Sequence, residues 1–230
     1  MKLILFDIDG TLLNSDGAGR RAIQRALVES FGTAGPEHHW FDGKTDPQIV
    51  FELMHLAGVE TATISARLDT VFARYVALLH DELATPGHGA RAYPGVPALL
   101  DALEARPEVT LGLLTGNVEP GARAKLQAAG IAPERFRVGA FGSDHAVRAE
   151  LPAIARTRAR ELLGREMPGH DMTVIGDTPA DLTCGRGVGA RAMGVATGRY
   201  SVSELSAYDA AAVFADFRDT AAVLDAILAA

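Results

Sequence analysis

The sequence has little of several features that would indicate particular classes of protein. Among 230 residues there is a single cysteine, Cys184, so no disulfide can form within the chain, and a reducing compartment is compatible with it. No stretch approaches the roughly 20 apolar residues of a membrane-spanning helix. The apolar run before Asp7 is also too short for the core of a signal peptide. We therefore predict a cytoplasmic protein without a membrane span.

Basic residues are scarce as well. The chain has 22 Lys and Arg against 29 Asp and Glu, which gives a formal net charge of -7. Nucleic acids and anionic membranes call for a basic patch, and the sequence has no dense basic run, so we predict neither as a partner. The seven histidines form no pair at metal-binding spacing, which argues against a zinc site.

Short apolar runs alternate with helical patterns along most of the chain. After a first run that begins at Leu3, strands are expected at Val109 to Leu114, Val138 to Phe141, Met172 to Ile175, Ala192 to Val195 and Ala212 to Phe214. Strands that alternate with helices indicate βαβ units and a parallel sheet. We predict an α/β fold with a Rossmann-like parallel sheet as its core.

One long segment departs from this alternation. From about residue 17 to residue 89, apolar residues recur only at helical spacing, between the first strand and the second. The simplest interpretation is an inserted helical domain over 17–89, with a core made of 1–16 and 90–230. The two ends of such an insert should lie close together in space.

The first strand runs directly into two carboxylates, Asp7 and Asp9. Ligands of parallel sheets bind at the carboxyl ends of the strands. Two like charges held so close together need a cation or a shared proton between them. A hard cation that prefers oxygen ligands, such as Mg2+, meets that need.

Two other expected strands also end in polar residues. One ends in Thr115, Gly116 and Asn117, which offer a hydroxyl, an approachable backbone N–H and an amide as donors for phosphoryl oxygens. The other ends in Asp177, and Asp181 follows one helical turn later. Each stretch also has a structural alternative, because the same residue types begin helices.

Together the three stretches resemble the motifs of the haloacid dehalogenase-like hydrolases. The first motif is Asp7-Ile8-Asp9-Gly10-Thr11, and Thr-Gly-Asn and Gly-Asp-x-x-x-Asp follow in the order that the family has. The resemblance implies a phosphatase that depends on Mg2+ and forms an aspartyl-phosphate. It also implies that the helical insert after the first motif is a mobile cap.

The resemblance further implies a role for each motif residue. Asp7 is expected to attack phosphorus, and Asp9 to act as the general acid and base. Mg2+ is expected to be held by Asp7, the main-chain carbonyl of Asp9 and Asp177, while Asp181 holds a metal-bound water or a neighbouring base. Residues expected to bind the substrate are Gly10, Thr115, Gly116 and Asn117.

The chain departs from the family at one catalytic position, where a lysine is usual. It has only three lysines, Lys2, Lys44 and Lys125. At the expected place stands Arg148, to which we assign the lysine's role because it keeps the positive charge and can bind two oxygens. The alternative is an arginine on a helix face that pairs with Glu150 or Asp144. Lys125 is expected to be a solvated surface residue.

A polar loop over 41–46 stands out within the helical insert. It is similar to a substrate-contacting loop in the caps of phosphoglycolate-phosphatase-like members. We expect Lys44 to meet the anionic end of a small substrate and Trp40 to form an apolar wall. The alternative is that the loop only begins a helix, with Thr45 or Asp46 as its cap and Lys44 in solvent.

The predicted function is Mg2+-dependent hydrolysis of a small phosphomonoester, such as phosphoglycolate or a sugar phosphate. Asp9 argues against a haloalkanoate dehalogenase, which needs no second acid, and against a phosphonatase, in which a small residue is expected there. Two alternatives stay open: a phosphohexose mutase of the same family, and a catalytically silent protein that binds a phosphorylated metabolite. The exact substrate and the oligomeric state are not predicted.

Overall fold

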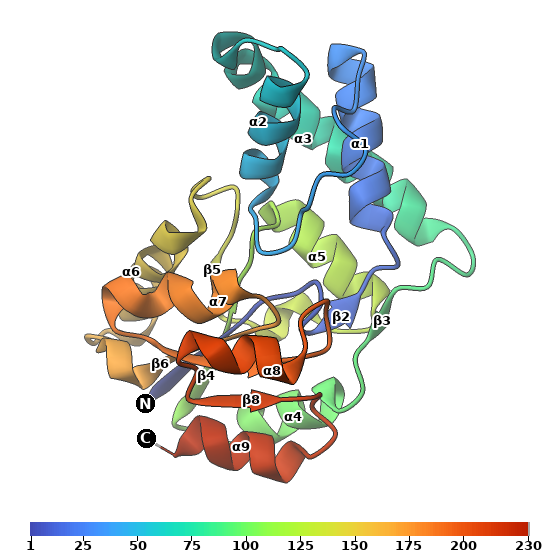
Figure 1. Ribbon diagram of the computed structural model, residues 1–230. Helices are drawn as coiled ribbons and strands as arrows, with labels where there is room; N and C mark the ends of the chain where they lie inside the picture. The colour runs from blue at the N-terminus through green and yellow to red at the C-terminus, as the bar shows by residue number, and fades with distance from the viewer. Residues whose placement is uncertain (230) are drawn as a thin grey trace.

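The computed structural model describes residues 1–229, and a parallel sheet lies at its centre (Figure 1). Its six strands have the order β5-β4-β1-β6-β7-β8, and every neighbouring pair is parallel. The strands are β1 (Lys2–Phe6), β4 (Val109–Leu114), β5 (Val138–Ala140), β6 (Met172–Gly176), β7 (Arg191–Val195) and β8 (Ala212–Phe214). The predicted α/β class with a Rossmann-like sheet is confirmed.

Helices cover both faces of the sheet. The helices of the core are α4 (Val96–Glu104), α5 (Glu119–Ala128), α6 (Leu151–Leu163), α7 (Pro179–Cys184), α8 (Val202–Leu205) and α9 (Thr220–Leu228). In β1, Ile4 and Phe6 pack in one hydrophobic cluster with residues of α4, α5 and α9, whereas Leu3 and Leu5 pack in another with residues of α6. Successive side chains of a strand point to opposite faces, which explains the unbroken apolar run of β1.

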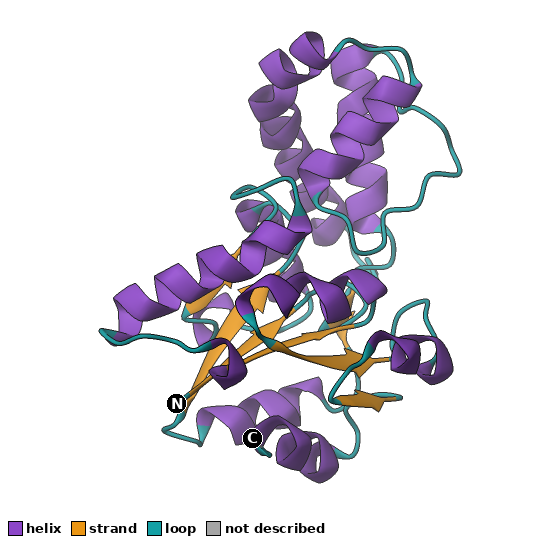
Figure 2. Ribbon diagram, turned by 60° about the vertical axis from the view of Figure 1, so that its left-hand side comes forward, coloured by secondary structure: helices purple, strands orange, loops and turns teal. Residues whose placement is uncertain are grey.

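Three helices form a separate group above the sheet, as Figure 2 shows. They are α1 (Ala18–Phe31), α2 (Asp46–Leu56) and α3 (Thr61–Ala84). Their apolar faces share a hydrophobic cluster of their own, which α5 joins through Val118 at its start and Ala124. The helical group therefore rests on α5.

A short ladder stands where the chain leaves the core for these helices and returns from them. Strand β2 (Leu13–Asn14) pairs antiparallel with β3 (Arg91–Ala92). The two ends of the helical segment thus lie side by side, as expected for an insert. Sequence reasoning missed both strands, since two residues are too few to show a pattern.

Short 3-10 turns complete the structure. They are η1 (Pro133–Arg135), η2 (Arg148–Glu150), η3 (Gly169–Asp171), η4 (Gly185–Val188) and η5 (Ser206–Tyr208). Within residues 1–229, no helix combines the length and the apolar character that crossing a membrane requires.

Candidate active site

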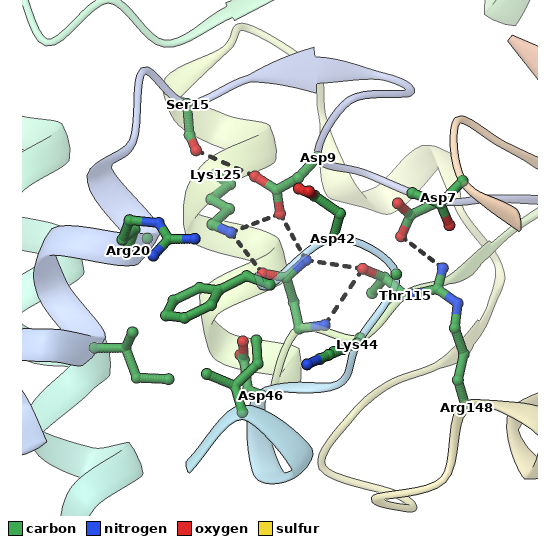
Figure 3. Close-up of a pocket in the computed structure, with 18 of the residues that line it drawn as sticks. Asp7, Asp9, Ser15, Arg20, Asp42, Lys44, Asp46, Thr115, Lys125 and Arg148 are labelled. Atoms are coloured by element: carbon green, nitrogen blue, oxygen red, sulfur yellow. Dashed lines mark hydrogen bonds and ion pairs between the residues drawn. The ribbon is translucent and has the colours of Figure 1, made fainter. Parts of the chain in front are cut away.

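The ends of the three central strands meet at one cavity. The register pairs Phe6 at the end of β1 with Leu113 of β4 and Ile175 of β6, so the residues that follow reach the same edge of the sheet. This edge is also where the strand order reverses, which is the usual ligand site of such sheets. Both Asp7 and Asp177 line the cavity there, which has a volume of about 210 Å³. Figure 3 shows Asp7 and Arg148 facing each other at this cavity.

A cluster of three buried carboxylates lies at the sheet side of the cavity. Asp7, Asp177 and Asp181 each offer an oxygen, and these oxygens lie within 4.8 Å of one another. Burial raises the pKa of Asp7 to about 6, and the Arg148 charge beside it only partly opposes this effect. Burial, together with repulsion from Asp181 and Asp7, raises the pKa of Asp177 well above its ordinary value. Burial and mutual repulsion therefore both oppose the ionisation of these carboxylates.

The chemistry of this cluster fits a hard divalent cation. Its donors are all carboxylate oxygens, which Mg2+ and Ca2+ prefer, and a cation would relieve the repulsion between them. Two glycines make room for the Asp177 carboxylate, because a side chain at either would overlap with it. A Cβ at Gly10 would lie 2.3 Å, and one at Gly198 1.8 Å, from Asp177 Oδ2. Thr11 steadies the same carboxylate by donating a hydrogen bond of 3.1 Å to Oδ1.

Asp181 belongs to the cluster, and its carboxylate forms an ion pair with Arg148, which agrees with the expected contact to a neighbouring base. From position N3 of α7 it also accepts hydrogen bonds from Thr178, of 3.0 Å from the backbone N and 2.6 Å from Oγ1, and so completes a capping box. The cap of α7 is therefore Thr178 rather than Asp177, which leaves the Asp177 carboxylate free to face the cavity.

Arg148 lies at the beginning of η2 and reaches into the core. Its guanidinium is 3.1 Å from Asp7 Oδ1 and also pairs with Asp181. Burial opposes its charge, but the carboxylates of Asp181 and Asp7 outweigh burial and raise the pKa of Arg148. The alternative, pairing with Glu150 or Asp144 on a helix face, is wrong. Asp144 is instead bound by Arg158, at 2.6 Å.

The end of β4 presents the expected hydroxyl and amide. Asn117 donates from Nδ2 to Thr115 Oγ1 at 2.8 Å and to Asp9 Oδ2 at 2.9 Å. Gly116 lies between them against the helical segment, because a Cβ there would lie 2.0 Å from the carbonyl oxygen of Lys44. All three residues line the cavity.

The loop over 41–46 closes the cavity from the helical side. Asp46 donates its backbone N–H to the carbonyl of Gly116 at 2.7 Å, and Thr45 Oγ1 donates to the carbonyl of Ala146 at 2.6 Å. Thr45 also caps α2, as one alternative had it. Lys44 nevertheless lines the cavity. Its ammonium is not alone in solvent, because it pairs with Glu52, which lies outside the cavity lining.

The expected apolar wall is formed by a different residue. Trp40 is 59% exposed, and its ring stacks against the guanidinium of Arg199, which is 3.7 Å from the ring centroid. Phe41 lines the cavity in its place, with the Arg20 guanidinium 3.7 Å from its ring centroid. The prediction for Trp40 is wrong because an exposed arginine offers its ring a partner outside the cavity.

Lys125 lines the cavity, and sequence reasoning missed it as a site residue. It is buried, and its Nζ donates to Asp9 Oδ2 and to Asn117 Oδ1, both at 2.6 Å. The expectation of a solvated surface lysine is therefore wrong. A signal existed, since Lys125 shares one face of α5 with the small residues Gly121 and Ala122, which indicates close packing there.

The Asp9 carboxylate is turned away from the acidic cluster. Ser15 donates to its Oδ1 at 3.1 Å, and Asn117 and Lys125 donate to Oδ2. Burial alone would raise the pKa of Asp9, but the Lys125 charge and these hydrogen bonds outweigh burial and lower it. The expected metal ligand in Asp9 is its main-chain carbonyl, and that expectation stays a prediction.

Comparison with known proteins agrees with this geometry. A family model described as haloacid dehalogenase-like hydrolase matches residues 4–186. The chain belongs to the haloacid dehalogenase-like hydrolases. It is 31% identical over 225 residues to a phosphoglycolate phosphatase of Rhodospirillum rubrum, with 94% of this chain and 88% of the relative covered. It is 32% identical over 197 residues to hexitol phosphatase A of Escherichia coli, with 84% and 82% covered.

Solved structures of haloacid dehalogenase-like hydrolases share the fold. A hydrolase from Pseudomonas syringae superposes with a TM-score of 0.74 at 21% identity, and the match covers 99% of each chain. The resemblance inferred from the three motifs is thus confirmed. The chain is an enzyme of the phosphoric monoester hydrolase class.

Proposed function

We propose that this enzyme is a Mg2+-dependent phosphatase that hydrolyses a small phosphomonoester through an aspartyl-phosphate on Asp7. The observation that carries the proposal is the buried Asp7 carboxylate, which lies within 3.1 Å of Arg148 and beside Asp177 at the cavity. A carboxylate can approach a phosphate dianion only where positive charge offsets their repulsion. The surroundings of Asp7 supply one such charge and the ligands for another.

The reaction has two steps. In the first, an Asp7 carboxylate oxygen attacks phosphorus, the bond to the leaving oxygen breaks, and that oxygen takes a proton from Asp9. In the second, Asp9 accepts a proton from water as the water oxygen attacks phosphorus. The bond between phosphorus and Asp7 then breaks, which frees inorganic phosphate and restores the carboxylate.

The remaining residues of the site hold the phosphoryl group. The guanidinium of Arg148 can bind two phosphoryl oxygens, and Thr115 offers a hydroxyl to the others. Asn117 takes part by donating its NH2 group to that hydroxyl and to Asp9. Asp7, Asp177 and the main-chain carbonyl of Asp9 would hold Mg2+, which supplies charge stabilisation of the phosphoryl oxygens when bound. We assign Asp181 to the support of Arg148 and of this site, which its ion pair favours.

We also propose that residues 17–89 form a cap domain over a core made of 1–16 and 90–230. The separate hydrophobic cluster of α1–α3 and the β2–β3 ladder at its base support this division. In this account Lys44 contacts the substrate from the cap, Gly116 lets the cap loop approach the end of β4, and Gly10 leaves room for the Asp177 carboxylate. Closure of such a cap would exclude water from the first step.

The substrate is proposed from the cavity and from the relatives. A volume of about 210 Å³ is below the range typical of drug-sized ligands, which favours a small phosphorylated metabolite. Because the relatives are named for phosphoglycolate and hexitol phosphates, these two esters are the first candidates. The lone, buried Cys184 is compatible with a reducing compartment, and we propose that the enzyme acts in the cytoplasm.

A panel of small phosphomonoesters tests the proposal. Phosphate release is measured with Mg2+ and with EDTA, for the native enzyme and for Asp7→Asn. We expect turnover that needs the metal and is lost in the variant. Phosphoryl transfer to a sugar hydroxyl without net phosphate release would indicate the mutase alternative. Tight binding of an ester without any turnover would indicate the silent binding protein.

A further inference from the structure

Lys125 has surroundings unlike those of an ordinary helix-surface lysine. Its residue is only 5% exposed, and its Nζ lies 2.6 Å from Asp9 Oδ2 and 2.6 Å from Asn117 Oδ1 (Figure 3). A buried ammonium is costly unless it is paired and hydrogen-bonded. Both of its partners belong to the motifs of the active site, although Lys125 itself lies on a core helix that follows them.

The fold brings the lysine to this place from two sides. In a helix the Cα–Cβ bond tilts toward the N-terminus, so a lysine in the last turn of α5 can reach back over the turns that follow Asn117. On the cap side, α1 has Gly19 at the point of contact, where a Cβ would lie 2.9 Å from Nζ. The ammonium is therefore enclosed between the core and the cap.

Lys125 fixes the orientation of the Asn117 amide. An ammonium only donates hydrogen bonds, so the Asn117 atom that faces it must be the carbonyl oxygen. The NH2 group of Asn117 is then directed to Thr115 and Asp9, as the structure has it. Without the lysine, Asn117 Oδ1 and Asp9 Oδ2 would lose the donor that they share.

Lys125 also completes the set of donors around Asp9. Ser15 holds Oδ1, while Asn117 and Lys125 hold Oδ2, so both oxygens of this carboxylate are fixed. From these contacts we propose that Lys125 is a positioning residue, whose ammonium holds Asp9 and Asn117 in the arrangement that proton transfer to the leaving oxygen requires. The proposal rests on the function proposed above, in which Asp9 serves that oxygen.

The effect of Lys125 on the rate should depend on the leaving group of the ester. An alkyl ester such as 2-phosphoglycolate expels a basic alkoxide and needs a proton from Asp9. In contrast, p-nitrophenyl phosphate expels a stable phenolate that needs little protonation. Because general acid catalysis typically contributes about 10² to 10⁴-fold, misplacing Asp9 should slow the alkyl ester far more than the aryl ester.

The experiment compares the two esters in matched variants. Lys125→Met keeps the length of the side chain and removes its charge, whereas Lys125→Arg keeps the charge. Arg123→Met is the control, since Arg123 lies on the same helix, pairs with Glu119 and is 49% exposed at its side chain. Ser15→Ala removes a different anchor of Asp9 and serves as the second test if Lys125→Met does not fold.

For Lys125→Met we expect kcat on 2-phosphoglycolate, or on the best alkyl ester of the panel, to fall by about 10²-fold or more, with KM little changed. On p-nitrophenyl phosphate the loss should stay below about 10-fold. Lys125→Arg should recover part of the alkyl-ester rate, and Ser15→Ala should show the same preference to a smaller extent. Arg123→Met should behave as the native enzyme on both esters.

Equal losses on the two esters in folded Lys125→Met would overturn the positioning role and leave Lys125 as a structural residue. In Ser15→Ala, equal losses would overturn it as well. If instead the native enzyme hydrolyses neither ester, the proposed phosphatase function fails before any variant is compared. The two failures are therefore distinguishable.

Discussion

Replacement of Asp46 by Asn should make the protein more stable at neutral pH. The Asp46 carboxylate is buried where α2 meets α5, and it accepts a hydrogen bond of 2.8 Å from the backbone N of Val118. Burial raises its pKa from 3.8 to about 6, and repulsion from Asp9 adds to the effect. The Lys125 charge and the Val118 hydrogen bond only partly oppose the rise. Tyr75 is the other titratable group that faces it.

The size of the effect follows from this shift. A rise of about two pKa units corresponds to about 3 kcal/mol. Between the unfolded and the folded pKa, the folded protein keeps a proton that the unfolded chain has lost, so the free energy of unfolding falls as the pH rises. About 2 kcal/mol of this loss should fall between about pH 4.5 and about pH 7.5. Asn stays neutral throughout and can still accept the Val118 hydrogen bond.

Urea unfolding of the native protein and of Asp46→Asn at about pH 4.5 and about pH 7.5 measures this difference. We expect the advantage of the variant to grow by about 2 kcal/mol between the two pH values. Asp69→Asn is the control, because Asp69 is an exposed carboxylate of α3. The reasoning is refuted if the advantage of Asp46→Asn is the same at both pH values, or if it is matched by Asp69→Asn.

Two further predictions concern the cavity. In Gly116→Ala the new Cβ would lie 2.0 Å from the Lys44 carbonyl and displace the loop over 41–46, so kcat should fall by about 10²-fold. In contrast, Gly187→Ala, which faces open space, should change nothing. Steady-state kinetics checks this, and native activity in Gly116→Ala would contradict it. Saturating Mg2+, at about 100 times its Kd, should stabilise the native protein by about 2.7 kcal/mol and Asp177→Asn by far less. Equal stabilisation of both in thermal unfolding would exclude Asp177 as a ligand.

The parts of the structure that local pattern determines could be predicted from the sequence. The run Leu3 to Phe6, which stops just before Asp7, is apolar at every position because both faces of β1 are buried. It can therefore be recognised as a strand from the sequence alone. β4 is also mostly apolar, and its predicted bounds match the structure. Since parallel strands end at one edge, their terminal acids, hydroxyl and amide could be expected to meet there.

Features that depend on contacts between distant segments could not be predicted. Lys125 is buried because Gly19 of α1 comes to lie on it. The small residues Gly121 and Ala122 indicate close packing on that face of α5, but they do not indicate which segment packs there. Trp40 points out of the cavity because Arg199 offers its ring a partner from the far end of the chain. The pairing of Arg148 with Asp7 and Asp181, instead of a local carboxylate, has the same origin.

The central claim is that Asp7 carries the phosphoryl group during turnover. Its most direct test is a rapid acid quench of the enzyme with its best ester and Mg2+, followed by mass spectrometry of the peptide that contains Asp7. The account predicts that this peptide gains the mass of one phosphoryl group, and that Asp7→Asn gains none. Turnover by the native enzyme with no phosphoryl group on Asp7 at any quench time, or with one on a different residue, would contradict it.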